Sequence, residues 1–129
     1  MNKKKEHTVR KYYIADAIEY GDTGAVLLYY IKYWVRRNEI KKSEKHFYEG
    51  RYWTFNSIPK WHLEFPEYSE DSLAYQLNEL EKKGAIITGN FNKMRRDRTK
   101  WYTLSGGTVI IPEANKVDNN ENNNSGEQQ

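Results

Sequence analysis

The stretch that decides the fold runs from residue 56 to residue 84 and reads NSIPKWHLEFPEYSEDSLAYQLNELEKKG. Its first half predicts a short helix that begins at an Asn56 or Ser57 cap and stops at Pro66. Its second half predicts a longer helix, with Ser69 as the N-cap and Gly84 as the residue that ends it. Because only a brief turn separates the two helices, the stretch predicts a helix-turn-helix unit.

The apolar residues of both helices follow helical spacing. In each helix they recur every three or four positions, which gives one face that is buried against the rest of the domain. The residues at these positions are Ile58, Trp61, His62 and Phe65 in the first helix, and Leu73, Leu77 and Leu80 in the second. The unit therefore has an inner face and an outer face, and the outer face is the candidate contact surface.

After Gly84 the periodicity changes to that of a strand. Residues 85–91 (AIITGNF) and 98–104 (RTKWYTL) predict two strands, and the intervening NKMRRD predicts a long basic tip. A β-hairpin that directly follows a helix-turn-helix unit is a wing.

Upstream of the unit, two further elements are expected. Residues 22–38 are apolar on nearly every face and predict a central helix, capped at Asp22 or Thr23. Arg36 and Arg37 would lie at the C-terminal end of its dipole. Residues 46–54 (HFYEGRYWT) predict a tight hairpin or at least one short strand.

These elements predict an α+β fold of the winged helix-turn-helix type, with three main helices and a C-terminal hairpin wing. We expect a basic N-terminal arm over residues 1–8, the winged-helix domain over 9–112, and an acidic, Asn-rich tail over 113–129. The tail has four acidic residues and one lysine, with almost no apolar residue, so it is expected to be disordered. The net charge of the whole chain is +3, and the positive charge therefore resides in residues 1–112, the arm and the domain together.

Composition narrows the function classes. Aromatic residues make up 15% of the chain, which favours a packed core over disorder. There is no cysteine, which excludes disulfides, thiolate zinc sites and cysteine nucleophiles. No stretch has the pattern of a signal peptide or the length of a membrane span, so we expect a soluble, cytoplasmic protein. Three scattered histidines, no phosphate loop and no nucleophile–base pair predict a non-enzymatic protein without metal or cofactor.

Several short motifs of the sequence, most of them containing an aromatic residue, occur in the order seen in one family. They are IKYW (31–34), GRYW (50–53), NSI..W (56–61), FP..SE (65–70), LEKKG (80–84), ITGNFNK (87–93) and DRTKWYTL (97–104). Over residues 22–104 the chain resembles the winged-helix module of replication proteins from bacteriophages and mobile elements of low-GC Gram-positive bacteria. The resemblance implies a DNA-binding module of a replisome organiser or replication initiator, acting in a bacterial host cell.

Three groups of residues are candidates for contact with double-stranded DNA. The wing supplies Lys93, Arg95, Arg96, Arg98 and Lys100, whose charges would release counterions from phosphates. The outer face of the second unit helix supplies Ser72, Tyr75, Gln76 and Asn78, which have the polar groups needed to read base edges. An auxiliary basic group near residue 40 consists of Arg36, Arg37, Lys41 and Lys42.

An alternative function comes from the charge of the helix-turn-helix unit. Residues 57–83 contain three lysines and six acidic residues, a face to which DNA would not be drawn by charge. The winged helix would then serve as a protein-binding module, such as a phage inhibitor of a host defence or replication complex. The TVII segment at 108–111 would be an added strand or a homodimer contact. Under the DNA-binding hypothesis, the protein would act either in replication initiation or in transcriptional control.

Overall fold

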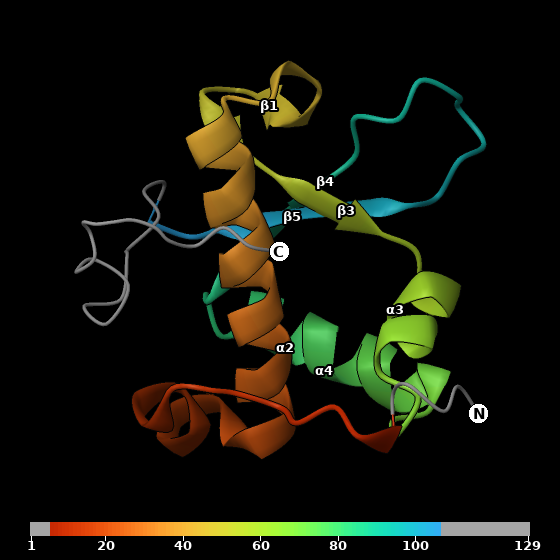
Figure 1. Cartoon of the computed structure of the whole chain (residues 1–129). Helices are drawn as coiled ribbons and strands as arrows, with labels where there is room; N and C mark the ends of the chain where they lie inside the picture. The colour runs from red at the N-terminus through yellow and green to blue at the C-terminus, as the bar shows by residue number, and fades with distance from the viewer. Residues whose placement is uncertain (1–5, 107–129) are drawn as a thin grey trace.

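A long helix, α2 (Ile14–Lys41), runs along one side of the computed structural model, which describes residues 6–106 (Figure 1). A helical turn, η1, and a short hairpin follow it, and then a strand, two helices and a pair of strands complete the α+β arrangement. The bounds are η1 (Glu44–His46), β1 (Phe47–Tyr48), β2 (Arg51–Tyr52), β3 (Thr54–Asn56), α3 (Ile58–Glu64), α4 (Glu70–Lys82), β4 (Ile86–Gly89) and β5 (Lys100–Leu104). The predicted disordered tail, the TVII segment and residues 1–5 of the arm lie outside the described residues.

The first helix is longer at both ends than the sequence predicted. It begins at Ile14, with Tyr13 at the N-cap position, and it crosses a kink at Gly21, where φ is 83° and ψ is 163°. That conformation lies in a region open essentially to glycine alone, so the chain changes direction there and starts the central helix beyond it (Figure 1). The helix ends at Lys41, one turn beyond Arg36 and Arg37, because Lys42 adopts a left-handed conformation with φ of 53°.

The caps of the two helices in the decisive stretch are confirmed. The Ser57 hydroxyl accepts a hydrogen bond from the Lys60 amide at 3.3 Å and starts α3. The Ser69 hydroxyl accepts one from the Ser72 amide at 3.0 Å and starts α4. Such caps satisfy amides that the helix leaves unpaired, and they are specified by neighbours in the sequence. This local origin explains why the predicted boundaries hold.

A three-stranded antiparallel sheet in the order β3-β5-β4 places β5 at its centre. Phe55 of β3 pairs with Trp101 of β5, and Thr88 of β4 pairs with Tyr102. The predicted strands were too long on the tip side, because regular pairing stops at Gly89 and resumes only at Lys100. The β1–β2 hairpin is as expected, with positive φ at both Glu49 (55°) and Gly50 (75°), as a type I′ turn requires.

The core lies where α2, α3 and α4 meet the inner face of the sheet. Its members are buried aliphatic and aromatic side chains from all these elements: Val26, Leu27, Leu28, Ile31, Val35, Trp61, Phe65, Leu73, Leu77, Leu80, Ile86, Tyr102 and Leu104. Asn38 is the buried polar side chain of α2, and its Nδ2 donates to the Trp53 carbonyl at 2.8 Å. This bond holds the segment that leads into β3 against α2. No helix within residues 6–106 has the length and apolar character to cross a bilayer.

Candidate functional site

The basic loop between β4 and β5 is organised by one side chain, Asn92. Its Oδ1 accepts a hydrogen bond from the indole Nε1 of Trp101 at 2.7 Å. Its Nδ2 donates to the carbonyls of Thr99 and Asp97 at 2.8 Å and 3.0 Å. Asn92 therefore ties the ascending and descending sides of the loop together where strand pairing has ended. The sequence analysis missed this role, although an asparagine just after a strand is a frequent turn former.

Asp97, the acidic residue within the basic segment, is committed to the loop's own backbone. Its Oδ1 accepts a hydrogen bond from the Thr99 amide at 3.0 Å, and this contact lowers the pKa of the carboxyl group. The Asp97 amide in turn donates to the Met94 carbonyl at 3.1 Å, which closes a turn at the tip. The carboxylate is thus directed into the loop's backbone rather than towards the neighbouring cations.

The five predicted wing cations are all exposed on this loop and at the start of β5. They are Lys93, Arg95, Arg96, Arg98 and Lys100, and none of them forms an ion pair within residues 6–106. The structure therefore presents a cluster of cations, referred to below as the loop cations, on a backbone that other residues hold in place.

A groove of about 480 Å³ separates this loop from α4 and the start of α3. Arg98 and Lys100 line its loop side, Ala74 and Asn78 line its α4 side, and Pro59 belongs to its α3 side. Arg98, Thr99 and Lys100 all line this groove, while the Trp101 ring packs against Phe55 and Phe91. Asn78 and two of the loop cations thus come together.

The four predicted contact residues of α4 do not share one surface. Tyr75 is 59% exposed and Asn78 faces the groove, while Ser72 is half-buried in the capped first turn. Gln76 was expected to point outward, and this is wrong. Its side chain is half-buried towards α2, where a Cβ added to Gly24 would meet the Gln76 Oε1 at 3.7 Å. Gln76 therefore lies in the contact between α4 and α2.

The auxiliary basic group lies apart from α4. Figure 1 shows the C-terminal end of α2 beside the β1–β2 hairpin, at the opposite end of the molecule from α4. Arg36 pairs with Glu39 at 3.1 Å, and Arg37 is half-buried with an Nε that has no hydrogen-bond partner. Lys41 and Lys42 are exposed. The auxiliary basic group is therefore separate from the α4 residues that are candidates for base contact.

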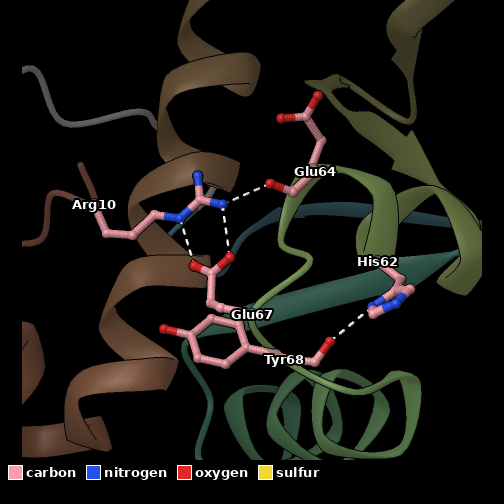
Figure 2. Close-up of polar contacts among 5 residues, drawn as sticks. All are labelled: Arg10, His62, Glu64, Glu67 and Tyr68. Atoms are coloured by element: carbon pink, nitrogen blue, oxygen red, sulfur yellow. Dashed lines mark hydrogen bonds and ion pairs between the residues drawn. The ribbon is translucent and has the colours of Figure 1, made fainter. Parts of the chain in front are cut away.

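Arg10 has a structural role that the sequence analysis did not assign. Figure 2 shows its guanidinium beside the turn between α3 and α4, where Nε and Nη2 bond to the two carboxylate oxygens of Glu67 at 2.6 Å and 3.0 Å. Nη2 also donates to the Glu64 carbonyl at 2.6 Å, and the group lies 4.1 Å from the centre of the Phe65 ring. The hydrogen bond to Glu67 is the main reason that the pKa of Arg10 is raised. No short-range pattern in the sequence could have indicated a contact between residues so far apart.

The same turn is held from the α3 side by His62. Its Nδ1 lies 2.7 Å from the Tyr68 carbonyl, which accepts the hydrogen bond (Figure 2). With Arg10 on one side and His62 on the other, the connection between α3 and α4 is fixed, and the angle between the two helices with it. Lys32 is likewise used internally, pairing with Asp16 at 2.8 Å.

Within the described part of the chain, no three histidine or acidic side chains gather as metal ligands would. The arrangement offers an ordered cationic loop, a groove beside it and an exposed tyrosine. Searches of the chain against protein-family models, curated proteins and solved structures gave no match.

Proposed function

We propose that this chain is a non-enzymatic winged-helix protein of phage or mobile-element origin that binds double-stranded DNA in replication initiation or transcriptional control. The order helix, strand, two helices, strand, loop, strand supports this fold, as does the sheet order β3-β5-β4. In a winged helix of this kind, α4 is the recognition helix and the loop at 90–99 is the wing. The resemblance of residues 22–104 to replication proteins of such elements supports the biological setting.

The observation that carries the proposal is the set of unpaired loop cations on a preorganised backbone. A flexible basic loop would lose conformational entropy on binding, whereas this loop is already held by Asn92, Asp97 and Trp101. Each phosphate that a cation neutralises releases counterions, so five exposed cations supply affinity that falls steeply with salt.

Because α4 is acidic, most of the electrostatic contact with DNA would come from the wing. Glu79 pairs with Lys82 at 3.6 Å, and Glu81 accepts a hydrogen bond from the Thr88 hydroxyl at 2.8 Å. These two carboxylates are thus partly engaged within the protein. Tyr75 and Asn78 remain as base-contacting or phosphate-contacting groups, and Arg98 and Lys100 across the groove would grip the adjacent backbone.

Fluorescence anisotropy on duplex DNA over a salt series tests the proposal. The variant Arg95→Gln/Arg96→Gln/Arg98→Gln should bind more weakly, and its salt slope should be shallower by about 2 to 3. The control is Lys82→Gln/Lys83→Gln, which removes two exposed charges at the C-terminal end of α4. Equal weakening by the control, or no binding of the parent protein at low salt, would contradict the proposal.

A second candidate is protein binding through the α3–α4 surface. It is favoured by two exposed apolar side chains on an acidic face, Leu63 (70% exposed) and Tyr75 (59% exposed). A pull-down from nuclease-treated bacterial lysate separates the two functions. Protein binding predicts a stoichiometric partner that is lost with Tyr75→Ser and retained with the triple arginine variant.

A further inference from the structure

The outer face of the sheet, opposite the core, carries a second layer of aromatic rings. Trp101 is 6% exposed and lies at the centre of this layer, on the opposite side of β5 from Tyr102, which packs on Trp61. Its ring lies 4.5 Å from Phe55 and 5.5 Å from both Tyr48 and Phe91, measured between ring centres. The layer joins the β1–β2 hairpin to the base of the wing, both of which lie above the sheet in Figure 1.

Phe55 is the ring of this layer that is most open to solvent. It is 40% exposed, although it sits on the buried Trp101. The His46 ring stacks alongside it, with 5.5 Å between centres and 17° between planes. The planes of the Phe55 and His46 rings are therefore nearly parallel, and Trp101 supports Phe55 from the sheet side, so the exposed part of Phe55 is already positioned for contact with a further flat ring.

Cations lie beside this pair on its His46 side. Lys41 and Lys45 are exposed, and they lie close enough to His46 that, after burial, their charges are causes that lower the pKa of its imidazole. The surface formed by Lys41, Lys45, His46 and Phe55 is called the outer surface below.

We propose that the outer surface binds single-stranded DNA, with one base stacked on Phe55 and the flanking phosphates at Lys41 and Lys45. An exposed aromatic ring beside cations is the arrangement that unpaired strands recognise, because every base has a flat face and every linkage has a charge. A duplex cannot use Phe55 in this way, since its bases are already stacked on one another. The inference rests on the proposed DNA-binding function. It adds single-stranded DNA as a second ligand, bound on a face separate from α4.

The test compares anisotropy on a labelled oligothymidylate of about twelve nucleotides with anisotropy on duplex DNA. Phe55→Leu keeps an apolar side chain on Trp101 but removes the ring, and it should weaken single-strand binding about tenfold. Duplex binding should stay unchanged, and Phe55→Trp should bind the single strand at least as tightly as the parent. The matched control is Tyr12→Leu, because Tyr12 is equally exposed (41%) but lies on the N-terminal segment before α2. It should alter neither affinity.

Three outcomes would overturn the inference. The first is that Phe55→Leu binds the single strand as tightly as the parent does. The second is that Phe55→Leu loses affinity for single-stranded and duplex DNA by the same factor while its urea midpoint is unchanged. The third is tighter binding of the corresponding RNA than of the DNA. Failure of the proposed duplex function is separately visible, because it appears in the salt series of the triple arginine variant. Lys41→Gln/Lys45→Gln gives an independent check and should reduce the single-strand salt slope by about 1 to 2.

Discussion

At the scale of single residues, Asn92 does the most to shape the candidate site, although it carries no charge. Its side chain satisfies three partners, the Trp101 indole and two backbone carbonyls, in a segment that has no strand pairing. Asn92→Ala should lower the free energy of unfolding by about 1 to 3 kcal/mol, because the buried indole N–H loses its acceptor. Urea denaturation measures this change, and duplex affinity should fall with it although no cation is lost.

Met94→Ala is the control for that prediction. Met94 is 63% exposed in the same loop, so its replacement should change the free energy of unfolding by less than about 0.5 kcal/mol. If Asn92→Ala were as stable as this control, the loop would owe its conformation to something other than the Asn92 hydrogen bonds.

At the scale of the elements, the kink in α2 depends on one glycine. A Cβ added at Gly21 would meet no atom within 4 Å, so the cost of Gly21→Ala comes from the backbone alone. With φ of 83° and ψ of 163°, alanine should destabilise the protein by about 1 to 3 kcal/mol. Gly106→Ala, which also has open space around it, should have little effect in the same thermal or urea measurement. Equal stability of the two variants would show that the chain can enter α2 by another path.

Elements with local signals were predictable, and elements set by distant contacts were not. The signals for α3, α4 and the first hairpin are Ser57, Ser69 and the Glu49-Gly50 turn. Each acts on its neighbours in the sequence, so these three elements could be predicted from the sequence. The N-terminal extension of α2 was missed because Ile14 and Ile18 are 74% and 81% exposed and leave no buried pattern.

The charged residues of the candidate site could be predicted from the sequence, but their arrangement in space could not. The loop cations were found because clustered charge is visible in a sequence. Gln76 was misplaced because its neighbour, the segment of α2 around Gly24, is distant in the sequence. Arg10 was given no role, since a bond to Glu67 across the fold has no local signature.

At the scale of the whole molecule, three buried or half-buried tyrosines make the stability depend on pH in the alkaline range. Burial is the main cause that raises the pKa of Tyr13, Tyr30 and Tyr102 to about 12, against 10.0 for an unperturbed tyrosine. The folded state therefore holds these protons more tightly than the unfolded state. The associated stability is fully present below pH 10 and is lost as the pH rises towards about 12.

The urea midpoint should accordingly fall across this pH range, and part of the tyrosinate absorbance should appear only with unfolding. Tyr30→Phe removes one of the three groups and should make the decline shallower. A midpoint that stays constant from pH 10 to about 12 would be inconsistent with protonated, buried phenols.

In the loop between β4 and β5, the residues that set the backbone differ from the residues that face outward. Asn92, Asp97, Thr99 and Trp101 define the path of the loop, whereas positions 93, 95, 96 and 98 contribute no hydrogen bond that holds it within the described chain. Substitutions at those four positions should therefore leave the backbone intact, so side chains there can be exchanged one at a time to change what the loop binds without loss of stability.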